Sequence, residues 1–101
     1  MWLMAMLDLP TDTDVARRRY TKFREALLDD GFVMIHFSVY ARHCISYKNL
    51  EVHEKRVKST IPEDGEVRLF RFTDRQFQKQ LVFYGKLRKA TEKTPEQLIF
   101  F

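Results

Sequence analysis

The sequence predicts an α+β domain in which an antiparallel sheet carries two helices on one face. The expected elements follow the order strand, helix, strand or hairpin, helix, strand, and both expected helices have one apolar face. Such an order fits the ferredoxin-like βαββαβ arrangement. We place this domain at residues 1–84, with a short C-terminal strand at its end, and expect residues 85–101 to form a connector and an apolar tail.

The first strand is expected at residues 2–7, because residues 1–7 are apolar without interruption. A run of this kind is typical of a central strand that is covered on both faces. A helix is expected to follow, since Asp12, Thr13 and Asp14 supply N-cap candidates and Gly31 is a natural helix end. Its inward stripe has steps of three and four residues and consists of Ala16, Tyr20, Phe23 and Leu27.

Residues 32–40 carry the strongest strand signal, because β-branched and aromatic residues dominate there. They form either one long strand or two short strands with a bend at residues 36–38. Ser46 is a candidate N-cap for the second helix, and we expect its charged residues, Glu54 among them, to point outward. The inward residues of that helix are expected to be Tyr47, Leu50, Val57 and Ile61.

The remaining elements are shorter. A third strand is expected at residues 66–73, after Pro62 and Gly65 end the second helix. Asp74 begins a short helical turn, and residues 81–84 have the composition of a further short strand. Residues 86–96 are polar and charged, so we expect them to form a connector.

One face of the predicted sheet lacks a cover, because both helices lie on the other face. The chain is 45% hydrophobic and has nine Phe residues, so it has apolar surface to spare. The simplest cover is a second copy of the same sheet, and we therefore expect a two-fold homodimer. The apolar tail at residues 98–101 suits strand addition to the second copy or to another partner.

The overall composition narrows the class of protein. The formal net charge is +4, which is compatible with nucleic acid or an acidic partner and proves neither. Cys44 is the single cysteine, so no internal disulfide can form and a reducing compartment is expected. The apolar run at residues 1–7 lacks a basic flank and is too short to cross a bilayer. We expect a soluble, cytoplasmic protein without membrane contact.

Asp8 is the leading candidate for a chemical role, because a carboxylate directly after a buried strand is a common position for a metal-binding residue in nucleases. The alternative is a turn residue whose side chain binds loop amides next to Pro10. Two-metal chemistry needs several carboxylates, whereas a two-fold axis would let two copies of Asp8 share one hydrated Mg²⁺. His43, Cys44 and His53 do not have the spacing of a zinc site.

Basic residues form the second candidate site. Arg17 and Arg18 lie in the first turns of the first helix, and Arg71 and Arg75 lie near the end of the third strand. Doubled by dimer symmetry, these residues and the lysines that follow them would make a positive surface that tracks a phosphate backbone. The alternative is a solvated face with pairs inside the helix.

Four segments of the sequence resemble a known family. They are MLDLPTDT, RRRYTKFREALLDDGF, MIHFSVYAR and VRLFRFTDRQF, and in this order they resemble the short form of the CRISPR-associated Cas2 family that accompanies type II systems. The resemblance extends from Met1 to about Tyr84. His36 departs from the pattern, because a glutamine is expected at that position.

The resemblance implies a ferredoxin-like homodimer at the centre of a complex with the CRISPR integrase, Cas1, that holds double-stranded DNA during spacer acquisition. It also implies a Mg²⁺-dependent endonuclease that acts on single-stranded RNA in some members and on DNA in others. Asp8 then corresponds to the catalytic, metal-binding residue, with Ser38 and Tyr40 as its neighbours, and Arg17 and Arg18 correspond loosely to a DNA-contacting region. A small ferredoxin-like regulatory module remains an alternative function.

Overall fold

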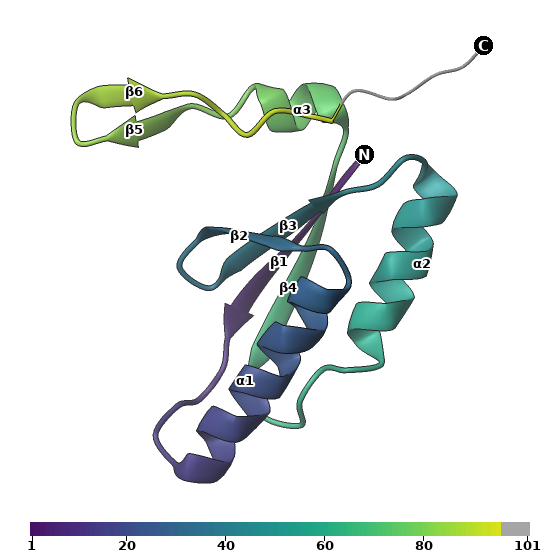
Figure 1. The fold of residues 1–101 in the computed structure, drawn as a ribbon, viewed down its shortest axis with the longest axis vertical. Helices are drawn as coiled ribbons and strands as arrows, with labels where there is room; N and C mark the ends of the chain where they lie inside the picture. The colour runs from purple at the N-terminus through teal and green to yellow at the C-terminus, as the bar shows by residue number, and fades with distance from the viewer. Residues whose placement is uncertain (96–101) are drawn as a thin grey trace.

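The computed structural model describes residues 1–95, which form a four-stranded antiparallel sheet, two long helices and a smaller C-terminal unit (Figure 1). The sheet has the strand order β2-β3-β1-β4, so β1 lies between β3 and β4 and the edges are β2 and β4. This is the order of the ferredoxin-like fold, as the sequence predicted. The elements are β1 (Trp2–Asp8), α1 (Asp14–Asp29), β2 (Val33–His36), β3 (Val39–His43), α2 (Tyr47–Lys58), β4 (Glu66–Phe72), α3 (Asp74–Gln78), β5 (Val82–Tyr84) and β6 (Leu87–Lys89).

Both long helices begin, and α1 also ends, where the sequence predicted, whereas α2 ends at Lys58, before Ile61 and Pro62. The side chain of Thr13 accepts a hydrogen bond from the backbone N–H of Ala16 at 3.0 Å, and Ser46 caps α2 in the same way. After α1, the N–H groups of Gly31 and Phe32 bind the carbonyls of Leu28 and Leu27 at 3.0 Å each. These two bonds form a Schellman motif, which requires the left-handed backbone of Gly31 (φ +91°).

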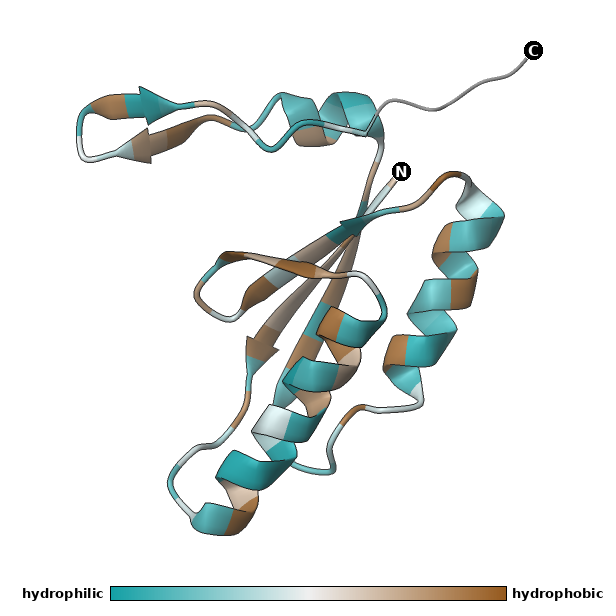
Figure 2. Cartoon of the chain, in the orientation of Figure 1, coloured by the Kyte–Doolittle hydropathy of each residue, from teal (hydrophilic) through white to brown (hydrophobic). Residues whose placement is uncertain are grey.

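Both helices are amphipathic and lie on one face of the sheet (Figure 2). The core between the layers contains Leu3, Ala5 and Leu7 from β1, and these contact buried helix residues. From the helices come Phe23, Leu27, Leu50 and Val57. The other predicted inward residues are less buried, and Tyr47 is 50% exposed.

The charged face of α2 is an exception to the sequence-based prediction. Glu54 was expected to point outward, but it is buried together with His53. Glu54 faces β4 and binds Arg71, which explains why the carboxylate is tolerated there.

The opposite face of the sheet, which we call the open face, is formed by alternate residues of each strand. On β1 these are Trp2, Met4, Met6 and Asp8, because Leu3, Ala5 and Leu7 face the helices. Contrary to expectation, the chain itself covers one end of this face. Phe77 of α3 stacks on Trp2 with ring centroids 4.0 Å apart, and Trp2 is only 5% exposed. Towards the other end Met6 is 41% exposed.

The segment at residues 32–40 forms two strands rather than one. Phe37 and Ser38 make a tight turn between them, and Ser38 has a left-handed backbone (φ +62°). The strand β2 is also irregular, since its register to β3 shifts between Met34 and His36. The strict alternation of a single strand therefore does not apply here.

The region expected to be a connector contains a strand. Val82–Tyr84 pairs with Leu87–Lys89, so the predicted boundary at residues 84 and 85 falls within the turn of a hairpin. Beyond β6 the chain returns to α3, where Gln78 donates hydrogen bonds to the carbonyl of Glu92 and the hydroxyl of Thr94 at 2.8 Å. The predicted apolar tail at residues 98–101 lies outside the described residues. No helix in the described part of the chain is long and apolar enough to cross a membrane.

Candidate functional site

Asp8 is the last residue of β1 and lies, exposed, on the open face of the sheet. Two neighbouring segments fix the backbone around it. On one side the N–H of Leu7 donates to the carbonyl of Ser38 at 2.8 Å, which continues the pairing of β1 with β3. On the other side Gly65 approaches so closely that an added Cβ would lie 2.8 Å from the carbonyl oxygen of Asp8. The strand end that carries Asp8 is therefore held from both sides.

A second carboxylate lies beside Asp8. Glu66 is the first residue of β4 and pairs directly with Asp8 in the antiparallel register, so both side chains project on the open face. Arg68, two residues further along β4, donates from its Nε to the carboxylate of Glu66. Glu66 was not predicted from the sequence, because it lies 58 positions after Asp8 and only the strand register brings the two together.

Of the two residues expected beside Asp8, Ser38 lies near it and Tyr40 does not. Ser38 lies next to β1, in the turn whose carbonyl binds Leu7. Tyr40 pairs with Ala5, so its side chain is on the helix face of the sheet, opposite to Asp8, and is fully buried. Its hydroxyl accepts a hydrogen bond from Nε of Arg24 at 2.9 Å, and burial raises the pKa of Tyr40 above its ordinary value. The structure therefore brings Ser38 near Asp8 and places Tyr40 in the core.

The open-face carboxylates have the chemistry that a hydrated Mg²⁺ ion accepts. Mg²⁺ binds oxygen ligands, commonly through one or two carboxylates while it retains several waters. Asp8 and its cross-strand neighbour Glu66 are both solvent-exposed, and one oxygen of Glu66 is already bound by Arg68. Within residues 1–95, no group of three or more His, Cys, Asp or Glu side chains could hold a metal ion. A site at Asp8 in one chain thus offers few protein ligands, which suits Mg²⁺ better than zinc.

The predicted basic residues of α1 lie on its exposed side near the start of the helix. Arg17 binds the carbonyl of Thr11 at 2.9 Å and forms an ion pair with Asp14, while Nε of Arg18 donates to the carbonyl of Asp14 at 3.4 Å. The Arg17–Asp14 pair is exposed on both sides, and such pairs contribute about 1 kcal/mol or less. The guanidinium groups can therefore leave these partners for a phosphate at little cost.

Arg71 and Arg75 differ in availability. Arg71 points to the helix face and binds both oxygens of Glu54, at 2.8 and 2.6 Å, and it also packs against the ring of Tyr47. These hydrogen bonds raise the pKa of Arg71 and lower that of Glu54. Arg75 lies on α3 and is exposed. The guanidinium of Arg71 is thus already bound within the chain, whereas Arg75 faces solvent.

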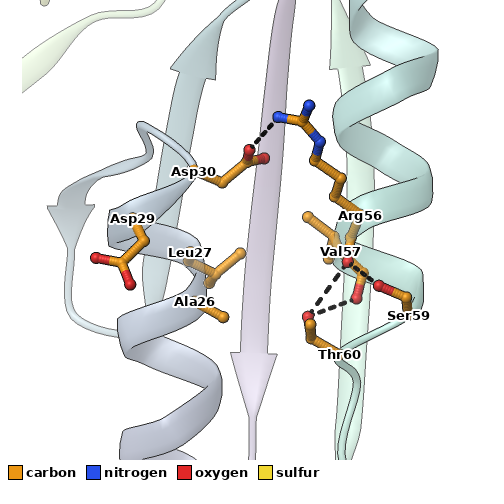
Figure 3. A pocket seen from close by; sticks show the side chains of 8 residues that line it. All are labelled: Ala26, Leu27, Asp29, Asp30, Arg56, Val57, Ser59 and Thr60. Carbon is orange, nitrogen blue, oxygen red and sulfur yellow. Dashed lines mark hydrogen bonds and ion pairs between the residues drawn. The ribbon is translucent and has the colours of Figure 1, made fainter.

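The C-terminal ends of α1 and α2 enclose a cavity of about 330 Å³ (Figure 3). Four of its polar lining residues, Asp30, Arg56, Ser59 and Thr60, are already paired. Asp30 accepts hydrogen bonds from Arg56 at 2.9 Å and contacts Nδ1 of His53 at 2.8 Å, and the hydroxyls of Ser59 and Thr60 bind helix carbonyls. The contacts of Asp30 with His53 and Arg56 join the end of α1 to α2. The cavity lies on the helix side of the sheet and is separate from Asp8.

Comparison with known proteins gives one consistent result. The family model described as CRISPR associated protein Cas2 matches residues 1–80. A relative from Parvibaculum lavamentivorans is 52% identical over 101 residues, which is 100% of this chain and 100% of the relative. A relative from Flavobacterium psychrophilum is 44% identical over 100% of this chain and 88% of its own, and one from Paracidovorax avenae is 41% identical over 100% and 94%. All three relatives are named CRISPR-associated endoribonuclease Cas2.

Proposed function

Because the chain belongs to the CRISPR-associated Cas2 family, we propose that it is the homodimeric scaffold at the centre of a spacer-acquisition complex. In this role it binds the backbone of double-stranded DNA and contacts the integrase Cas1 in the prokaryotic cytoplasm. The observation that carries the proposal is the open face of the sheet. A rigid sheet with an apolar, partly uncovered face is suited to permanent association with a second copy.

The open face supports a dimer by its composition and by its position. Phe77 covers Trp2 at one end, but Met6 and Val33 further along the face are 41% and 53% exposed. Phe37, in the turn between β2 and β3, is 83% exposed. Apolar side chains that gather on one face of a small protein usually mark an interaction site. Analytical ultracentrifugation of the purified chain tests the dimer directly, and a monomer at micromolar concentration would contradict it.

The start of α1 supports binding to a DNA backbone. Arg17 and Arg18 are exposed, adjacent, and held only by weak surface contacts, so a duplex can take them as phosphate ligands. We expect the R17E/R18E variant to lose spacer acquisition in cells and to bind duplex DNA with a shallower dependence on salt. Lys55→Glu, which changes an exposed cation on α2, is the matched control. Normal acquisition by R17E/R18E would refute the DNA-holding role of α1.

A second function, a metal-dependent endonuclease centred on Asp8, is favoured by the pair of carboxylates on the open face. In that function Asp8 and its neighbour Glu66 hold a Mg²⁺ ion, which polarises the phosphodiester and activates water when bound. The relatives named endoribonuclease make single-stranded RNA the first substrate to test. The carboxylate of Asp8 is solvent-exposed, so removing its charge should leave the fold intact.

The two functions are separated by the Asp8→Asn variant. The nuclease function predicts that this variant loses Mg²⁺-dependent RNA cleavage, while Asp12→Asn, which changes an exposed carboxylate in the following loop, retains it. The scaffold function predicts that Asp8→Asn still supports spacer acquisition. If the purified variant cleaves RNA as fast as the wild-type chain, Asp8 is not the catalytic residue.

The dimer also determines whether two copies of Asp8 share one ion. Mg²⁺ binds oxygen at about 2.1 Å, so direct coordination by both carboxylates requires the two residues to lie within about 8 Å of one another. A crystal structure of the dimer grown with Mg²⁺ measures this separation. A longer distance would leave one site in each chain, made by Asp8 and Glu66.

A further inference from the structure

The excess positive charge of the chain is concentrated in the unit formed by α3 and the β5–β6 hairpin. Residues 1–73 contain 12 Lys and Arg residues and 11 Asp and Glu residues, so that region is nearly neutral. Residues 74–95 contain six basic and two acidic residues. No acidic residue occurs between Arg75 and Thr91, a stretch that includes the whole hairpin. This unit projects beyond the layers of the sheet and the long helices (Figure 1).

The hairpin presents two different faces. Tyr84 and Leu87 close it around a two-residue turn, and Gly85 has the positive φ (+56°) that the first position of a type II′ turn requires. Phe83 lies opposite Arg88 on one face. The other face carries Tyr84, Leu87 and Lys89.

The two faces differ in how far their aromatic and basic groups are already engaged. On one face Nζ of Lys89 donates to the hydroxyl of Tyr84 at 3.0 Å and lies 4.9 Å from the centre of its ring. On the other face Phe83 is 52% exposed. Arg88 forms no hydrogen bond or ion pair with any residue that the structure describes. The Phe83–Arg88 face therefore offers a free ring beside a free cation.

A free ring beside a free cation fits an unpaired nucleotide. The ring stacks on a base and the cation binds the adjoining phosphate, and this combination is what proteins use to bind single strands without sequence preference. The bases of a duplex are stacked inside the helix and are not available to Phe83. A protein strand that packed on the hairpin would cover its apolar side chains. It would also bury basic side chains that have no acidic partner on the hairpin, which is costly.

We propose that the Phe83–Arg88 face of the hairpin binds single-stranded nucleic acid, with Phe83 stacked on a base and Arg88 and Lys86 at the phosphates. The proposal rests on the nucleic-acid binding proposed above and adds a second contact surface, distinct from α1, with a different substrate preference. Two strands of three residues are marginal without a partner, so the bound strand also stabilises the hairpin.

Fluorescence anisotropy with the full chain tests this proposal. The probes are labelled single strands of about 20 nucleotides, longer than one common binding site, as DNA and as RNA, and a DNA duplex of the same sequence. Phe83→Ala should weaken single-strand binding by about 5-fold to 150-fold, the range for loss of one stacked base. Leu87→Ala, an exposed apolar change on the opposite face, is the matched control and should alter binding less than about 2-fold.

The salt dependence gives a second, independent result. Removal of one cation that binds a phosphate of a single strand reduces the slope of log K against log salt by about 0.7, so K86A/R88A should reduce it by about 1.4. Unchanged single-strand affinity in Phe83→Ala, or equal losses in Phe83→Ala and Leu87→Ala, would overturn the proposal. If the wild-type chain binds the duplex but neither single strand, only the hairpin proposal fails. If it binds none of the three probes, the proposed DNA-holding function fails with it.

Discussion

Replacement of Phe77 by alanine tests how the C-terminal unit is held to the sheet. Phe77 is 3% exposed and stacks on Trp2 with an angle of 9° between the rings. It is the buried residue of α3, a helix of five residues that is too short to be stable alone. Removal of the ring therefore takes away the main apolar attachment of α3 to the open face.

The magnitude follows from the burial and the stacking. A buried Phe→Ala change costs about 3–5 kcal/mol, and a stacked aromatic pair contributes about 0.5–1.5 kcal/mol beyond the buried area. The helix also has polar tethers, since Asp74 binds the N-terminal amine at 2.6 Å and lies 3.1 Å from Nε2 of His43. Because these tethers keep part of the attachment, we expect the low end of the range, about 3 kcal/mol. For a domain of this size that loss lowers Tm by about 12–24 °C.

Trp2 is the single tryptophan of the chain, so its fluorescence reports on the stacking with Phe77 directly. We expect the emission of Phe77→Ala to shift to longer wavelength in the native state, and its urea midpoint to fall. Phe83→Ala, which removes an exposed ring from the same unit, should change the free energy of unfolding by about 0.5 kcal/mol or less. Native emission equal to wild type, with a loss below about 1 kcal/mol, would refute the role of Phe77 as the anchor of α3.

Three further outcomes follow from the structure. Gly65→Ala should destabilise the fold by about 2 kcal/mol, because φ is +92° and the new Cβ would meet the backbone of Asp8; circular dichroism melting measures this. Glu54→Gln should cost about 1–3 kcal/mol in urea unfolding at pH 7, because the charged hydrogen bonds to Arg71 are removed. The hydrogen bonds from Arg71 hold the pKa of Glu54 below its ordinary value, so this stabilisation is present above the unfolded pKa and is lost as pH falls through the folded pKa. Urea titrations below pH 5 should therefore show a smaller fall in stability for Glu54→Gln than for wild type.

The parts of the fold that the sequence predicted are those set by local chemistry. The caps at Thr13 and Ser46 and the helix end at Gly31 depend on residues within one turn, and all three are confirmed. The hairpin at residues 82–89 was missed because Leu87–Lys89 contains two charged residues and resembles a connector. Its pairing with β5 becomes evident only from the turn at Gly85.

The parts that the sequence could not predict depend on contacts between distant residues. Glu54 is charged, so the helical pattern placed it outside, but Arg71 on β4 allows it to be buried. Glu66 was not recognised as a neighbour of Asp8 for the same reason, since the register of two strands decides which residues face each other. In both cases the surroundings of a polar side chain depend on a strand that is distant from it in the sequence.

Both proposed functions use residues of the open face. Asp8 and Glu66 project from the same side of the sheet as Met6, so a second copy that covers the exposed apolar residues also comes close to the carboxylates. Arg68 already compensates Glu66, so it is burial of the Asp8 charge that is costly unless a cation or a second basic group compensates it. A dimer through this face should therefore be stabilised by Mg²⁺ and weakened by chelation, and Asp8→Asn should remove that dependence. A dimer whose dissociation constant is the same with Mg²⁺ and with EDTA would place the carboxylates outside the contact.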